Sequence, residues 1–209
     1  MNPPPGIQDG FSASGVAGDE VRAVGVEFGV AWSAQGGVPM TARRSQARVH
    51  IRPMTTRDLK QAVAMEAACF GADAWPQQAF RELLRVFGQG GPTRGGLWVA
   101  EDSGSGEVLG YAGIEVSALW GEADIINIAV AAQHRRRGVG RALLEWIIRR
   151  CRRSGIELLW LRVRASNRSA QRFYRNMGFD QRGKFTGYYR DPNEAAVLMA
   201  TDLAERQAE

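Results

Sequence analysis

The stretch Arg135-Arg136-Arg137-Gly138-Val139-Gly140-Arg141 determines how this sequence is best interpreted. An apolar, β-branched run at residues 123–130 precedes it and predicts a central β-strand. Residues 139–153 follow it, with apolar side chains on one helical face and arginines on the other, which predicts an amphipathic helix. We therefore expect a strand, a tight glycine-containing turn and a helix in direct succession.

The two glycines of this turn, Gly138 and Gly140, suit an anion-binding site. They remove side chains where the N–H groups of the first helical turn point outward. The helix dipole and the neighbouring arginines add positive potential, so a ligand that carries phosphate groups fits. A strand-to-helix turn with a solvated basic face would show the same pattern without any ligand. The third glycine of a dinucleotide-binding fingerprint and the Gly-Lys-Ser/Thr of a P-loop are both missing.

The flanking sequence predicts one α/β domain with the element order βααβββαβαββ. Turn and cap signals such as Thr55-x-x-Asp58, together with the apolar periodicity, define the elements. We expect strands at residues 50–54, 97–100, 108–114, 123–130, 156–164, 179–189 and 194–203, and helices at 55–68, 76–87, 139–153 and 167–177. At least one helical crossover must then join parallel strands.

Composition limits the class of protein and its partners. The chain has 209 residues, 44% of them hydrophobic, and lacks the run of about 18 apolar residues needed to span a bilayer. Its net charge of +5 comes from arginine, because Lys60 and Lys184 are its only lysines, and it favours an anionic partner. Two isolated cysteines, Cys69 and Cys151, fit reduced buried thiols in a cytoplasmic protein better than a disulfide or a metal site.

Residues 1–48 differ in composition from the remainder of the chain. They are rich in Gly, Ala, Ser and Pro, and bury too little apolar surface to offset the entropy of ordering. We expect a disordered or misassigned N-terminal extension, with Met40 as an alternative start, and one domain at residues 49–205. The mildly apolar stretch at 21–32 is too interrupted by charges and glycines for a signal peptide.

The arginine and glycine pattern resembles a known family. Arg135-x-x-Gly138-x-Gly140 is similar to the coenzyme A pyrophosphate loop of the GCN5-related N-acetyltransferases (GNAT), and residues 167–179 resemble a second motif of that family. The likeness extends over residues 51–203. Asn127-Ile128-Ala129-Val130, Leu159-Trp160-Leu161 and Tyr188-Tyr189 resemble the ribosomal-protein-alanine (RimI-like) subfamily. The resemblance implies a mixed central sheet of about seven strands with helices on both faces.

The resemblance also implies where ligands bind. Acetyl-CoA would lie in a gap between the two central strands, with pantetheine on the backbone at residues 128–130 and pyrophosphate on the arginine-rich loop. The implied cofactor-binding residues are Ile128, Ala129, Val130, Arg135, Arg136, Arg137, Gly138, Val139, Gly140, Arg141 and Asn167. No metal is implied.

Tyr174 occupies the family position of the general acid that protonates the departing CoA thiolate. A phenol with a pKa of about 10 is protonated at pH 7 and can donate; plain core packing is the alternative role for this side chain. The N–H near Val130 would stabilise the oxyanion of the tetrahedral intermediate. Family segments that frame the acceptor slot correspond here to Trp75, Tyr188 and Tyr189, with aromatic packing as their alternative role.

Arg162 departs from the subfamily pattern. It occupies the place of the usual acidic base, and a guanidinium cannot accept a proton. Either Glu115, Glu122 or Asp124 acts through water, or no strong base is needed. The second option suits an α-amine, whose pKa is about 7.7–8.0, better than a lysine amine at about 10.4. Arg162 facing the slot would favour acceptors with acidic or small early residues.

We therefore expect an acetyl-CoA-dependent N-acetyltransferase that acts by direct attack in a ternary complex on a protein N-terminus, first of all that of a ribosomal protein. One alternative keeps the fold and cofactor but takes a small amine as acceptor. Another is a nucleic-acid-binding module without turnover, although we expect contact with nucleic acid only incidentally, through the ribosome. We expect no membrane partner.

Overall fold

The computed structural model describes residues 49–88 and 95–204 as an α/β fold. Its strands are β1 Val49–Pro53, β2 Gly95–Asp102, β3 Val108–Ser117, β4 Glu122–Val130, β5 Leu158–Arg164, β6 Asp180–Arg190 and β7 Asn193–Asp202. Its helices are α1 Leu59–Phe70, α2 Gln77–Phe87, α3 Val139–Arg153 and α4 Arg168–Asn176, with short 3-10 turns η1 Thr56–Asp58, η2 Gly71–Asp73, η3 Ala118–Trp120 and η4 Ala132–His134. The predicted order of elements is confirmed. The prediction for residues 1–48 lies outside the described residues.

Element boundaries differ from the predicted ones by a few residues, for local reasons. Thr55 and Asp58 form the expected capping box, but it closes the 3-10 turn η1, so α1 begins only at Leu59. Pro76 is extended and stands just before α2 as its N-cap rather than as the first helical residue. No helix in the described ranges is long and apolar enough to cross a membrane.

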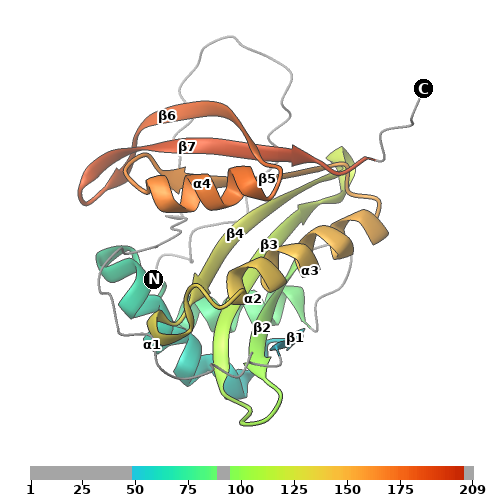
Figure 1. Ribbon diagram of the computed structural model, residues 1–209, viewed down its shortest axis with the longest axis vertical. Helices are drawn as coiled ribbons and strands as arrows, with labels where there is room; N and C mark the ends of the chain where they lie inside the picture. Colours follow the sequence, from blue (N-terminus) through green and yellow to red (C-terminus); the bar gives the residue numbers. More distant parts are fainter. Residues whose placement is uncertain (1–48, 89–94, 205–209) are drawn as a thin grey trace.

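All seven strands form one sheet in the order β1-β2-β3-β4-β5-β7-β6 (Figure 1). Its only parallel neighbours within the described chain are β4 and β5, joined through α3, which is the expected crossover. β7 pairs antiparallel with β5, and β6 lies outside it as the edge strand. The arginine-rich turn thus leads out of the carboxyl end of the central strand β4.

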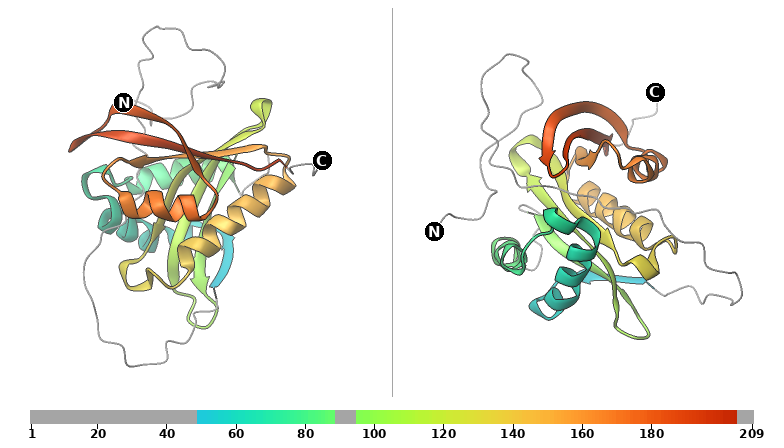
Figure 2. Two further views of the ribbon diagram at one scale, coloured as in Figure 1. Left: turned by 45° about the horizontal axis from the view of Figure 1, so that its top comes forward. Right: turned by 90° about the vertical axis from the view of Figure 1, so that its left-hand side faces the viewer.

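Helices cover both faces of the sheet, as expected, with α1 and α2 on one face of β2–β4 and α3 on the other (Figures 1 and 2). Alternate strand residues supply two cores. In β2, Leu97 and Val99 pack with α1 and α2, whereas Trp98 and Ala100 pack with α3. The sheet is therefore buried on both sides at its centre, and each face can present a different set of residues.

A β-bulge at Ile126 bends the central strand. The register with β3 passes from Ile125 to Asn127, so Ile126 is an extra residue. Ile125 and Ile128 both belong to the α3-side core while Ile126 belongs to the opposite one, so the alternation shifts by one residue. The bulge lies just beyond the point where β4 and β5 stop pairing.

Candidate active site

The two central strands separate beyond a short paired segment. β4 pairs with β5 only through Glu122–Leu158, Ala123–Leu159 and Asp124–Trp160. From there β5 keeps its pairing with β7 as far as Arg164, while β4 continues beside β3 to Val130. The β5-facing backbone edge of β4 at residues 125–130 therefore has no partner strand within the described chain, and backbone amides in the middle of a sheet need hydrogen-bond partners. A ligand with amides of its own can supply them.

We call the divergence of β4 and β5 beyond Asp124 and Trp160 the fork. The N-terminus of α3 lies at its open end. Gly138 is the N-cap with φ of 85°, a left-handed conformation that glycine adopts without strain, and Arg136 has φ of 61°. The first helical bond inside α3 joins the Ala142 N–H to the Gly138 carbonyl at 2.9 Å. The N–H groups of residues 139–141 precede it and have no acceptor within the helix. They form a compact set of donors at the positive end of the helix dipole.

Gly140 lies beside this set of donors and close to two apolar side chains. A Cβ there would lie 3.6 Å from Cγ2 of Val130 and 3.9 Å from the ring of Phe173. Gly140 thus faces the end of β4 and helix α4 together. A larger side chain would fill the space between them, which explains why a bare residue suits this position.

The four predicted arginines of the loop divide into two kinds. Arg136, Arg137 and Arg141 are exposed, and Arg141 bonds Glu145 at 2.8 Å. Arg135 is half-buried: its Nε donates to the Val130 carbonyl at 3.1 Å and its Nη2 contacts Sγ of Cys69 at 3.2 Å. Arg135 therefore ties the loop to β4 and α1, while the others reach solvent beside the helix N-terminus.

Tyr174 is fully buried on the same face. Its ring contacts Phe173 and Phe179 at centroid distances of 5.2 and 5.7 Å, and its hydroxyl has no hydrogen-bond partner among the described residues. Burial raises the pKa of this phenol, so it is protonated at neutral pH. A buried hydroxyl without a partner is costly, which points to a partner supplied by a ligand. Asn167, in contrast, uses its side-chain oxygen to cap α4 through the Ala170 N–H at 3.0 Å.

Arg162 lies on the opposite face of the sheet. Leu161 and Val163 pack in the α3-side core, so Arg162 between them points toward the α1–α2 side. Its Nη1 donates to Oδ2 of Asp124 at 2.7 Å, and its guanidinium lies 4.4 Å from the ring centroid of Trp160. Arg162, which replaces the expected acidic base, is therefore bonded to Asp124, one of the three carboxylates considered as alternative bases.

The other two carboxylates are placed differently. Glu115 is the register partner of Asp124 on β3, and burial together with the Asp124 charge raises its pKa. Glu122 pairs with Ser117 and Leu158, toward the closed end of the fork. Of the three, Asp124 stands in the last residue pair before the strands separate.

Arg164 connects two segments that frame this second face. It bonds Asp73 in η2 and Glu194 in β7, the latter at 3.2 Å, and its guanidinium lies 4.0 Å from the ring centroid of Tyr189. The α1–α2 connection is thereby attached to the β6–β7 hairpin. Sequence reasoning did not single out Arg164, although its spacing of two from Arg162 already placed both arginines on one face of a strand.

The three predicted acceptor-side aromatics are not equally accessible. Tyr189 is fully buried, whereas Tyr188 is half-buried and its ring lies 5.8 Å from the Arg162 guanidinium. Trp75 is buried against Phe80 at 5.6 Å, and its indole Nε1 has no partner within the described chain. Tyr188 is the one of the three with exposed surface beside Arg162.

Glu66 of α1 is a buried carboxyl that sequence reasoning missed. It accepts hydrogen bonds from the Trp75 N–H at 3.0 Å, from Nδ2 of Asn127 at 3.1 Å and from the Tyr111 hydroxyl. Burial raises its pKa to about 8, although the bonds from Trp75 and Asn127 oppose the shift. It links the Trp75 segment to β4 next to Ile128. A single Glu in a helical stretch carries no local sequence signal that it is buried, so the sequence did not indicate this role for Glu66.

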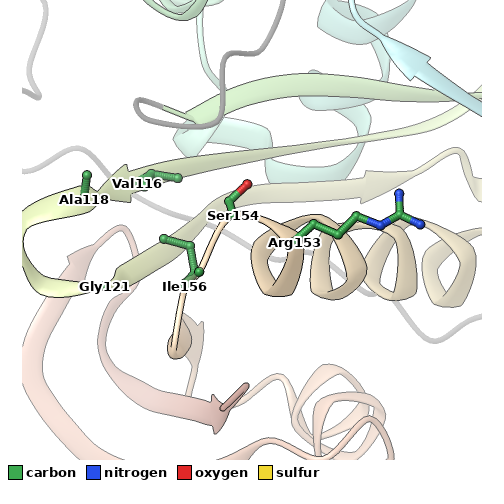
Figure 3. A pocket seen from close by; sticks show the side chains of 7 residues that line it. Val116, Ala118, Gly121, Arg153, Ser154 and Ile156 are labelled. Atoms are coloured by element: carbon green, nitrogen blue, oxygen red, sulfur yellow. The ribbon is translucent and has the colours of Figure 1, made fainter. Parts of the chain in front are cut away.

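A separate hollow lies at the other end of α3 (Figure 3). It is lined by Val116, Ala118, Gly121, Arg153, Ser154, Gly155 and Ile156. Because α3 has 15 residues, this hollow is about 20 Å from the helix N-terminus. It contains none of the predicted site residues.

Known proteins share both the sequence pattern and the fold. The family model of the acetyltransferase (GNAT) family matches residues 59–179. The N-alpha-acetyltransferase RimI of Mycobacterium tuberculosis is 32% identical over 161 residues, covering 75% of this chain and 94% of the relative. The [ribosomal protein bS18]-alanine N-acetyltransferase of Escherichia coli is 41% identical over 85 residues, which span only 57% of its length.

A solved structure agrees with these matches. The crystal structure of the ribosomal-protein-S18-alanine N-acetyltransferase from Escherichia coli superimposes with a TM-score of 0.64 at 29% identity, covering 77% of this chain and 99% of that one. These likenesses show that the chain belongs to the acetyltransferase (GNAT) family, where it is similar to RimI-like members.

Proposed function

We propose that this protein transfers the acetyl group of acetyl-CoA to the N-terminal α-amine of a protein, first of all a ribosomal protein, by direct attack in a ternary complex. The observation that carries the proposal is the fork between β4 and β5. It separates phosphate-suited donors at the start of α3, on one face of the sheet, from a polar cluster around Arg162 on the other. Two reactants approaching from opposite faces can meet there.

The residues on the α3 face fit coenzyme A. The N–H groups of residues 139–141, which have no acceptor within α3, and the exposed Arg136 and Arg137 suit a diphosphate. The edge of β4 at residues 128–130, which pairs with no strand on its β5 side in the described chain, suits the amides of the pantetheine arm. The buried, unpartnered Tyr174 hydroxyl suits a sulfur atom at the end of that arm.

Each part of this site has a defined task in acyl transfer. An N–H on the open edge of β4, between Asp124 and Val130, stabilises the oxyanion as the amine attacks the thioester carbon. Tyr174 donates its proton to the departing sulfur, because its raised pKa keeps the phenol protonated at the operating pH. Arg135 holds the end of β4 in place through the Val130 carbonyl.

The kind of acceptor follows from the amine. A protein α-amine has a pKa of about 7.7–8.0 and is partly neutral at pH 7, whereas a lysine side chain at about 10.4 is almost fully charged. A site in which Arg162 replaces a carboxylate suits the less basic amine. The similarity to proteins named for bS18-alanine acetylation supports a ribosomal protein as acceptor.

A CoA-release assay with three acceptor panels tests this proposal. Peptides with a free N-terminal alanine, N-blocked peptides with an internal lysine, and small polyamines are compared at equal concentration. We expect release only with the first panel. Turnover with the polyamines alone would favour the small-amine alternative. Absence of turnover combined with steeply salt-dependent RNA binding would favour a nucleic-acid-binding module.

A further inference from the structure

We propose that Asp124 is the proton acceptor for the incoming amine and that Arg162 is the positioning residue that holds it. This inference rests on the proposed acetyl transfer. It assigns a base to a site in which Arg162 stands in place of the usual acidic residue. It is carried by the place of Asp124 in the sheet, by the unequal bonding of its two oxygens and by its ion pair with Arg162.

Asp124 stands where the fork begins. Asp124–Trp160 is the last pair of the parallel ladder, so the carboxylate lies at the vertex between β4 and β5. Ala123 and Ile125 on either side of it pack in the α3-side core, so Asp124 points toward the other face, as Arg162 does. The open edge of β4 begins at the next residue.

The two carboxylate oxygens of Asp124 have different surroundings. Oδ2 accepts from Nη1 of Arg162 at 2.7 Å. Oδ1 is buried and has no hydrogen-bond partner among the described residues. A buried carboxylate oxygen without a donor is unfavourable. The N–H of an acceptor amine, directly or through one water, supplies the missing donor.

Arg162 explains how a buried carboxylate stays available as a base. Desolvation raises the pKa of Asp124, and the Arg162 charge and hydrogen bond oppose that shift. Stacking on Trp160 and on Tyr188 fixes the guanidinium. The facing charged groups are Glu115 on β3, which favours the protonated form, and Arg162 on β5, which favours the ionised one. Arg162 on β5, where the subfamily usually has an acidic base, thus keeps Asp124 on the neighbouring strand β4 ionised.

The proton balance of the reaction is complete with these residues. Asp124 takes one proton from the ammonium group, and the neutral nitrogen forms the C–N bond to the thioester carbon. The C–S bond breaks with its electron pair on sulfur, and Tyr174 protonates that sulfur. The second proton lost from nitrogen restores the phenol through solvent, and Asp124 releases its own proton to solvent.

The test is the pH dependence of the Asp124→Asn variant with an amine that the wild type acetylates. For an α-amine, of which about an eighth is neutral at pH 7, we expect kcat/KM to fall about 20-fold at that pH. The deficit should shrink to about threefold at pH 9.5, where the amine is neutral without assistance. Asp180→Asn, which makes the same change at an exposed position of β6, is the matched control and should stay within about twofold of wild type at every pH.

Arg162→Met provides an independent measurement that does not depend on how well Asp124→Asn folds. Removing the cation raises the pKa of Asp124, so the acid limb of the kcat profile should move to higher pH. A purely structural role for the pair would lower the rate without moving the limb. Thermal unfolding and CoA titration of both variants separate loss of folding or of cofactor binding from loss of the base.

Two results would overturn the assignment. One is an Asp124→Asn variant that folds, binds CoA and keeps its rate at pH 7, or that shows the same deficit at all pH values. The other is an unmoved acid limb in Arg162→Met. A wild-type protein that acetylates small amines but no peptide would defeat the proposed acceptor class, while the role of Asp124 would still be tested with those amines.

Discussion

Arginines on the two faces of the central fork behave in opposite ways. On the α3 face, Arg136 and Arg137 are exposed, with no ion-pair partner among the described residues. On the other face, Arg162 and Arg164 are half-buried and bonded to carboxylates. Unpaired, solvated cations are available to an anionic ligand, whereas paired ones hold neighbouring segments in place. We therefore propose a binding role for the exposed arginines and a positioning role for the paired ones.

Replacing Tyr174 with Phe tests the catalytic end of the α3 face and should give the largest effect. We expect kcat to fall about 100-fold, or about 2.7 kcal/mol of barrier, because the departing sulfur loses its proton donor. Stability should stay equal or rise, because an unpartnered buried hydroxyl is removed. Initial-rate assays measure kcat, and thermal unfolding measures stability. A rate within about twofold of wild type would contradict the acid role.

Replacing Arg164 with Met tests the positioning role on the other face. Asp73 and Glu194 would lose their common partner, so we expect about 2–3 kcal/mol of destabilisation by urea unfolding and a raised KM for peptide. Arg182→Met is the control, since it removes a more exposed pair with Asp202 and should cost less than about 1 kcal/mol. Equal losses in the two variants would mean that Arg164 is not a structural clamp.

Replacing Arg136 and Arg137 together with Ala tests the binding role on the α3 face. We expect the Kd for CoA to rise about 10-fold, or about 1.4 kcal/mol, with unchanged thermal stability because neither side chain is packed. Arg149→Ala with Arg153→Ala makes the same charge change near the other end of α3 and should alter the Kd less than about twofold. Calorimetric titration with CoA distinguishes the two. An equal effect would indicate only a general attraction by net charge.

Glu66→Gln should change stability little at pH 5 and increasingly as the pH rises toward 8. The pKa of Glu66 is raised to about 8 from 4.5, so between these values the folded protein keeps a proton that the unfolded chain has released. Its contribution to stability is present below about pH 4.5 and lost as pH rises through 8, by at most about 1.4 kcal/mol per pH unit. The variant should flatten that slope in chemical unfolding between pH 5 and 8. An identical slope in both proteins would contradict the shift.

Much of the fold was predictable because its signals are local. The apolar run of β4, the glycines at the start of α3 and the amphipathic pattern of α3 each depend on neighbouring residues only. The likeness of residues 135–140 to the CoA loop led to the family, which the family model and the relatives confirm. Boundaries shifted where a 3-10 turn or a proline cap intervened, as at Thr55 and Pro76.

The site was predictable in part only, because much of it consists of contacts between distant segments. Arg162 was singled out as a departure from the subfamily, but not as the partner of Asp124, 38 residues away. Arg164 and Glu66 join segments separated by 91 and 45 residues, and no local pattern encodes such contacts. The direct cofactor contacts at Arg136, Arg137 and Asn167 stay predictions.

The sequence by itself determined the order of elements, the parallel crossover and the position of a phosphate-suited helix N-terminus, because periodicity and glycine placement act within a few residues. Only the tertiary structure decided which arginines are paired, that the buried Tyr174 hydroxyl has no hydrogen-bond partner among the described residues, and that Asp124 stands at the vertex of the fork. The physical reason is that burial and ion pairing depend on which strands become neighbours. That is decided only when the strands assemble into one sheet and the helices pack on its two faces.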